Sequence, residues 1–214
     1  DVRALMIIGE DPVVTDPDQH QVARAFAALD FLVVFELTLT ETAKMADVVL
    51  PAASFVEKDG TFTKCERRVQ RIRKAIDAPG EARIDWQILG ELAARLGYAD
   101  MVWDSAEALF GEMAAVTPLF SAMSYAGLDA NHGLQWPCNA EHPQGSPVLH
   151  AQSFPLGKAR LFPLTQVEPA EGPDAQYPFV FTTHRFHFHY NCGSMTRKSP
   201  LLERETPAGL LLIN

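Results

Sequence analysis

Two polar loops each follow a predicted buried strand. The first, Gly9-Glu10-Asp11-Pro12, comes after the apolar run 4–8, and the second, Glu36 to Thr42, comes after the run 31–35. Ligands of open α/β sheets bind beyond the carboxyl ends of the strands. A carboxylate in the first loop can accept hydrogen bonds from a ribose or a base, while hydroxyls and backbone N–H groups in the second can hold an anion at a helix start. A plain turn and a capped helix without a ligand are the alternatives.

Charged side chains mark two further positions. The Glu-Arg-Arg cluster at 66–68 follows a β-like stretch, and paired Arg side chains can grip a phosphate with two parallel hydrogen bonds. A solvated face or a structural salt bridge is the alternative for this cluster. Asp85 precedes an apolar helical stretch, where it can cap the helix or accept two hydrogen bonds from the N–H edge of a guanine.

Histidines are concentrated near the end of the chain. His184, His187 and His189 lie within six residues, and the last two would share one face of a strand. No Asp, Glu or Cys is regularly spaced beside them, although a zinc site needs three or four ligands. We therefore predict hydrogen-bonding side chains that face a polar ligand, and no metal site.

Composition limits the class of protein. Hydrophobic residues make up 47% of the 214 residues, which suffices for a core, and the net charge of -9 disfavours nucleic-acid binding. No apolar run is long enough to cross a bilayer, and no signal-peptide pattern opens the chain. Because the sequence begins with Asp1, we expect a processed chain or a fragment. Cys65, Cys138 and Cys192 form no CxxC pair, which predicts free thiols in a reducing compartment.

Alternating strands and helices must position the two loops. The predicted strands cover 4–8, 31–35 and 48–50, and the predicted helices cover the stretches that open at 16–18 and 40–43 and the segment 83–96. Short apolar runs ended by Gly or Pro are typical of buried parallel strands. Strand–helix–strand repeats at this spacing predict an α/β fold with an open, mostly parallel sheet and flanking helices.

The second half of the chain is less regular. The predictions are a helix over 105–113, a loop over 118–147, a strand over 157–164, a Pro-rich linker over 163–178, and strands over 178–182 and 210–213. Two or three strands cannot close a barrel or bury both faces of a sheet. The C-terminal unit therefore needs more chain or a partner to cover its edges.

The order of these stretches resembles a known family. The matching segments are GEDP, ELTLTETAKMADVVLPAASFVEKDGTFTKCERRVQRIRKAI, IDWQILGELAARLGY, LQWPC and YPFVFTTHRFHFHYNCGSMTRKSP. Together they resemble part of the large (alpha) subunit of formate dehydrogenases, in the molybdopterin oxidoreductase superfamily. The likeness is strongest over residues 3–98 and 177–200.

The resemblance implies an architecture and a cofactor. It implies that 1–150 is part of an α/β molybdopterin guanine dinucleotide-binding domain, that 151–176 is a linker, and that 177–214 starts a β-barrel domain, left incomplete. The implied cofactor is bis(molybdopterin guanine dinucleotide) with molybdenum or tungsten. A [4Fe–4S] cluster belongs to the parent subunit, but these residues do not ligate it.

The resemblance also carries cofactor-binding roles onto matching positions. These positions are Glu10, Asp11, Pro12, Glu36, Thr38, Thr40, Asp85, Thr183, Arg185, His189, Ser194 and Met195. The chain departs from the family pattern at Phe35-Glu36, where Gln-Asp is common, and at Lys64, where Asn is common. No family role is carried to His184 or His187.

The implied function is cofactor binding within an enzyme that oxidises formate to CO₂. No catalytic residue and no metal ligand falls in this chain, so the segment alone is expected to be inactive. Implied partners are the rest of the same subunit and electron-transfer subunits of the Fe–S, flavin or hydrogenase type, in the cytoplasm. The alternatives are a segment of another molybdopterin oxidoreductase, such as a nitrate reductase, or a non-catalytic nucleotide-binding scaffold.

Overall fold

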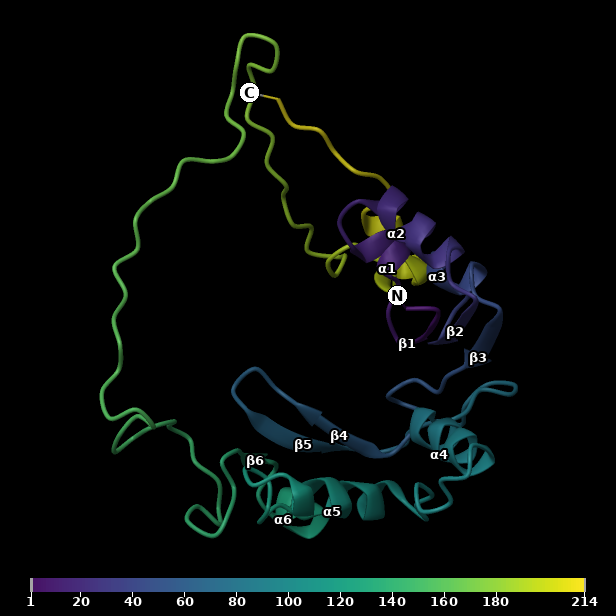
Figure 1. Cartoon of the computed structure of the whole chain (residues 1–214), viewed down its shortest axis with the longest axis vertical. Coiled ribbons are helices and arrows are strands. Elements are labelled where there is room, and N and C mark those ends of the chain that lie inside the picture. Colours follow the sequence, from purple (N-terminus) through teal and green to yellow (C-terminus); the bar gives the residue numbers. More distant parts are fainter. Residues whose placement is uncertain (1, 214) are drawn as a thin grey trace.

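A three-stranded parallel sheet organises the first fifty residues. In the computed structural model, which describes residues 2–213, β1 (Ala4–Ile8), β2 (Phe31–Glu36) and β3 (Val48–Pro51) lie in the order β1-β2-β3 (Figure 1). Ile8 is opposite Phe35, and Glu36 is opposite Pro51, so all three strands end at one edge. The predicted α/β fold with an open parallel sheet is confirmed.

Three short helices flank this sheet. They are α1 (Pro12–Thr15), α2 (Gln19–Ala27) and α3 (Glu41–Lys44), and only α1 was not anticipated from the sequence. The core on this side of the sheet joins Ile7, Leu32 and Val34 to residues of α2 and α3. The Asp18 side chain caps α2 by accepting a hydrogen bond from Gln21 N at 3.1 Å, so the helix begins after Asp16-Pro17-Asp18 rather than within it.

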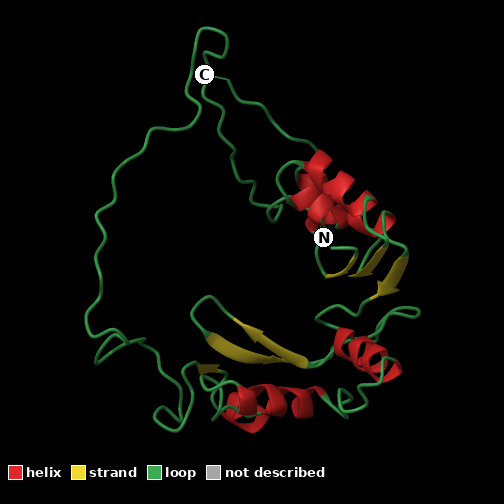
Figure 2. Ribbon diagram, in the orientation of Figure 1, coloured by secondary structure: helices red, strands yellow, loops and turns green. Residues whose placement is uncertain are grey.

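A second, antiparallel sheet follows. It contains β4 (Gly60–Thr63), β5 (Arg68–Ile72) and β6 (Leu134–Gln135) (Figure 2). The accompanying helices are α4 (Asp85–Arg95), α5 (Ala106–Val116) and α6 (Tyr125–Ala130). The predicted helices over 83–96 and 105–113 are confirmed as α4 and α5, with shifted ends.

The predicted loop over 118–147 is wrong in part. This stretch contains α6 and β6, and five of its residues belong to a core cluster with Val69 of β5: Met123, Tyr125, Leu128, Leu134 and Cys138. Gly, Pro and Asn do mark turns there, but the apolar residues between the turns supply a core that brings distant segments together.

The strands predicted at 157–164, 178–182 and 210–213 do not form. Between β6 and η1 (Thr196–Lys198), the described chain has only an isolated bridge from Phe154 to Gly157, and α7 (Pro200–Glu205) follows η1. A strand requires a continuous hydrogen-bonded neighbour, and apart from that single bridge at Gly157 no described segment pairs with these stretches. The start of a barrel at 177–214 stays a prediction. No helix within residues 2–213 has both the length and the apolar character needed to span a bilayer.

Candidate functional site

The two strand-end loops meet a C-terminal turn around a pocket of about 340 Å³. Because β1 and β2 are neighbouring parallel strands, their carboxyl ends place Glu10 and Glu36 at the same edge of the sheet. Seven of the sequence-predicted site residues line this pocket: Glu10, Asp11, Glu36, Thr38, Thr40, Ser194 and Met195. The structure thus brings together residues that are up to 185 positions apart in the sequence.

The pocket offers both acceptors and donors. Glu36 already accepts a hydrogen bond from Leu37 N at 2.5 Å, and the Glu10 carboxylate has no hydrogen-bond partner among the described residues. Ser194 and Lys198 line the same pocket and supply a hydroxyl and an ammonium group. Carboxylates suit ribose hydroxyls or the N–H edge of a base, while an ammonium suits a phosphate.

Asp11 and Thr40 hold the loops in place. Asp11 is buried, and its Oδ1 accepts hydrogen bonds from Thr42 N at 2.9 Å and from Thr42 Oγ1 at 2.7 Å. Thr40 caps α3 by accepting a hydrogen bond from Ala43 N at 3.2 Å. The capping interpretation of this loop is therefore correct, and it coexists with a pocket position. Pro12 begins α1 and does not line this pocket.

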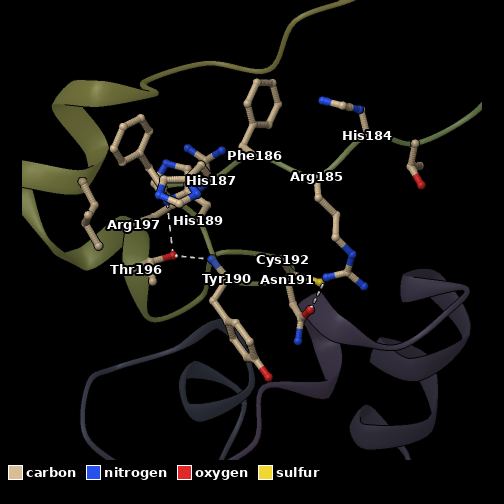
Figure 3. A pocket seen from close by; sticks show the side chains of 13 residues that line it. His184, Arg185, Phe186, His187, His189, Tyr190, Asn191, Cys192, Thr196 and Arg197 are labelled. Atoms are coloured by element: carbon tan, nitrogen blue, oxygen red, sulfur yellow. Dashed lines mark hydrogen bonds between the residues drawn. The ribbon is translucent and has the colours of Figure 1, made fainter.

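A second, larger cavity of about 980 Å³ surrounds the His-rich segment (Figure 3). Thr183, Arg185 and His189 line it, and Arg185 Nη1 donates to Asn191 Oδ1 at 2.9 Å. The two His189 ring nitrogens contact Thr196 Oγ1 at 3.2 Å and the Thr206 carbonyl at 2.9 Å. His184 and His187, which received no role from the sequence, also line this cavity.

Asp85 lies outside the pockets described here. It forms an ion pair with Lys58, and both side chains are about a quarter exposed. The alternative that Asp85 caps the following helix is wrong, because the N-cap of α4 is Ile84 and no side chain caps it. A guanine contact by Asp85 stays a prediction.

The arginines of the 66–68 cluster have structural partners. Arg67 donates to the carbonyls of Trp136 and Ser146, the latter at 3.1 Å, and Arg68 Nη1 donates to the Gly133 carbonyl at 3.1 Å. These hydrogen bonds tie β5 to the segment that follows α6. The structural interpretation of this cluster is therefore correct, with carbonyls rather than acids as the main partners.

The cysteines have no partner thiol. Cys138 is buried in the core of the second sheet, and this burial raises the pKa of its thiol. Cys65 and Cys192 are exposed, and Cys192 lines both cavities. Within residues 2–213, no three His, Cys, Asp or Glu side chains gather in a way that could hold a metal ion.

Sequence reasoning missed several residues that line the first pocket. Among them are Thr15, Asn191, Cys192 and Lys198. The last three lie within four positions of Ser194 in the sequence, so proximity to a predicted residue was the available signal. Thr15 gave no signal, because its place depends on the unpredicted helix α1.

Comparison with known proteins finds similar sequences. The family model described as molybdopterin oxidoreductase matches residues 1–95. The chain is 47% identical to the F420-dependent formate dehydrogenase 2 subunit alpha of Methanococcus maripaludis and 47% identical to the corresponding subunit of Methanocaldococcus jannaschii. Both alignments cover 100% of this chain and 32% of the relative, so the chain spans about a third of their length.

One solved structure has a partial likeness. The acetylene hydratase of Pelobacter acetylenicus matches 63% of this chain and 18% of its own, with a TM-score of 0.49 and 19% identity. The sequence relatives confirm the resemblance to formate dehydrogenase alpha subunits. Residues 1–95 are thus similar to the molybdopterin oxidoreductase family, and the whole chain is similar to part of formate dehydrogenase alpha subunits.

Proposed function

We propose that these 214 residues are a cofactor-binding segment of the large subunit of a formate dehydrogenase. The cofactor would be bis(molybdopterin guanine dinucleotide) with molybdenum or tungsten. The observation that carries the proposal is the pocket where Glu10, Glu36 and Ser194 come together from three distant segments. The identity to formate dehydrogenase subunits favours formate over nitrate as the substrate of the whole protein.

The residues present fit the nucleotide part of such a cofactor. The pocket volume of about 340 Å³ lies in the range of small-molecule sites. Glu10 and Glu36 can accept hydrogen bonds from ribose or guanine, and Lys198 can pair with a phosphate. When bound, the cofactor supplies the metal that takes two electrons from formate. The role of this segment is to bind and orient the cofactor.

The rest of the same subunit is the first proposed partner. One face of the parallel sheet is covered by α2 and α3, but the other leaves Met6 38%, Ile8 42% and Val48 37% exposed. Parallel sheets are normally covered on both faces. We propose that the remaining two thirds of the subunit cover this face and ligate the metal and a [4Fe–4S] cluster. Electron-transfer subunits and a cytoplasmic location are proposed from the resemblance alone.

The test removes the two pocket carboxylates from the full-length protein. We expect Glu10→Ala and Glu36→Ala each to lower the guanine nucleotide released per polypeptide by about ten-fold, since each removes a charged hydrogen-bonding group. Glu81→Ala is the matched control, because it removes an exposed carboxylate that lines neither cavity. The nucleotide is measured by chromatography after acid release, beside formate-dependent dye reduction. Nucleotide content equal to that of the control would refute the proposal.

A further inference from the structure

A short unit at residues 189–206 carries Ser194 and Met195 to the pocket. The unit consists of a turn, η1 and α7, and the hydrogen bond between His189 Nε2 and the Thr206 carbonyl joins its two ends. His189 stands at its centre, with a side chain that is only 5% exposed. The resemblance assigned His189 to the cofactor, but its polar contacts are made inside this unit.

The backbone carbonyl fixes the direction of the hydrogen bond at His189 Nε2. A backbone carbonyl can only accept, so His189 Nε2 carries the hydrogen that is donated to Thr206 O at 2.9 Å. In the neutral ring, Nδ1 is then an acceptor and receives the Thr196 hydroxyl at 3.2 Å. The same hydroxyl oxygen accepts from Tyr190 N at 3.2 Å. Both ring nitrogens therefore have partners inside the unit, and Nε2 also lies 3.6 Å from Glu203 Oε2, so neither nitrogen remains free for a ligand.

A second set of contacts within the unit involves Arg197. Arg197 Nη1 donates to both carboxylate oxygens of Glu203, at 3.2 and 3.1 Å. The Arg197 side chain also lies over Gly193, where a Cβ atom would approach it to 3.0 Å. Gly193 has a φ of +79°, which glycine adopts without strain. The turn that precedes Ser194 is therefore held from both of its ends.

We propose that His189 is a positioning residue: it holds the 189–206 unit so that Ser194 and Met195 face the cofactor pocket, without touching the cofactor itself. This inference rests on the proposed function. In place of the direct cofactor contact that the resemblance implied, His189 acts indirectly, through Thr196 and Thr206. Loss of the His189 bonds should loosen the unit and lower cofactor retention, whereas a side chain that restores them should not.

The test uses three variants of the full-length protein. His189→Gln can still donate to Thr206 O and accept from Thr196, so we expect cofactor content within about two-fold of the parent. His189→Leu and Thr196→Val each break the chain of bonds, and we expect about five-fold less cofactor, as for the loss of a buried hydrogen bond. The double variant His189→Leu/Thr196→Val should be no lower than His189→Leu, because both changes break the same link. Hydrogen exchange across 189–206 should be faster in both single variants.

Several outcomes would overturn the inference. These are a Gln variant as poor as the Leu variant, a Thr196→Val protein with parental cofactor content, and a double variant whose loss is the product of the two single losses. If His189→Leu does not fold, Thr196→Val decides, because it removes only one hydroxyl. If the parent protein contains no guanine nucleotide, the proposed function fails, and hydrogen exchange alone then decides the role of His189. Unchanged hydrogen exchange across 189–206 would then contradict the proposed role of His189.

Discussion

Glu10 and Asp11 are adjacent carboxylates with different surroundings. The Glu10 side chain lines the pocket without a partner among the described residues, whereas Asp11 is buried and accepts two hydrogen bonds from Thr42. The partner of Asp11 is 31 positions away, so the sequence predicted that the loop is polar but not which acid serves the fold. The same holds for His189, whose partners lie 7 and 17 positions further on.

Asp85 is a residue whose two possible roles can be separated. It pairs with Lys58 in the structure, whereas the sequence resemblance predicts that it contacts the cofactor. In the full-length protein we expect Asp85→Ala to lower nucleotide content by about ten-fold, because the loss of a charged hydrogen-bonding group costs about 1–3 kcal/mol and ten-fold corresponds to about 1.4 kcal/mol. Lys58→Ala, which removes only the other half of the ion pair, should change it less than two-fold. Nucleotide released per polypeptide is the measurement.

The Asp85→Ala and Lys58→Ala variants serve as controls for each other. If Asp85 serves only the ion pair, both substitutions leave the nucleotide content unchanged and lower the melting temperature by a similar amount. Equal nucleotide losses in Asp85→Ala and Lys58→Ala would also contradict a direct guanine contact, because Lys58 cannot mimic the acceptor that a guanine edge requires.

At the scale of elements, the sequence predicted the strands whose burial shows in their own residues. The apolar runs that became β1, β2 and β3 are recognisable because a buried parallel strand is apolar throughout. The pairing of β6 with β5 was not predictable in this way, since Leu134 meets Val69 across 65 positions. The stretches 178–182 and 210–213 carry a strand signal but lack a paired neighbour, and a strand signal alone does not make a sheet.

The turn from α6 into β6 depends on Gly133. This residue has a φ of +97°, and a Cβ atom there would approach the Val69 carbonyl oxygen to 2.7 Å. We expect Gly133→Ala to destabilise the protein by about 1–3 kcal/mol for the backbone conformation, and by about as much again for the collision with β5. The midpoint of thermal unfolding of the full-length protein is the measurement.

Gly157→Ala is the matched control for this substitution. Gly157 has a φ of +87°, but no atom outside its two neighbouring residues lies within 4 Å of the position that an alanine methyl group would take there. It therefore isolates the conformational cost from the collision. A Gly157→Ala protein that melts as low as Gly133→Ala would show that the approach of Gly133 to β5 is unimportant.

At the scale of the whole molecule, the pocket depends on a long connection. Residues 148–181 contain no helix or strand, and they run from the second sheet back towards α1 and α2 (Figure 1). Leu161 is 93% exposed and Leu164 is 94% exposed, so packing does not restrain this connection. Ser194 and Met195 nevertheless reach the strand-end loops, and the short unit at 189–206 supplies the order that the connection lacks.

The final prediction tests the linker expected at 151–176. An exposed segment without regular hydrogen bonds fits a protease active site more readily than a paired strand does. Within these 214 residues of the full-length protein, we expect trypsin to cut first after Lys158 or Arg160, both of which are exposed. Arg68 is the internal control, because it lies in β5 and its guanidinium donates to the Gly133 carbonyl at 3.1 Å. Mass spectrometry of a time course identifies the first cut. A first cut at Arg68, or resistance at both linker sites, would mean that the rest of the subunit packs against 151–176, and the boundary between the two proposed domains would have to lie elsewhere.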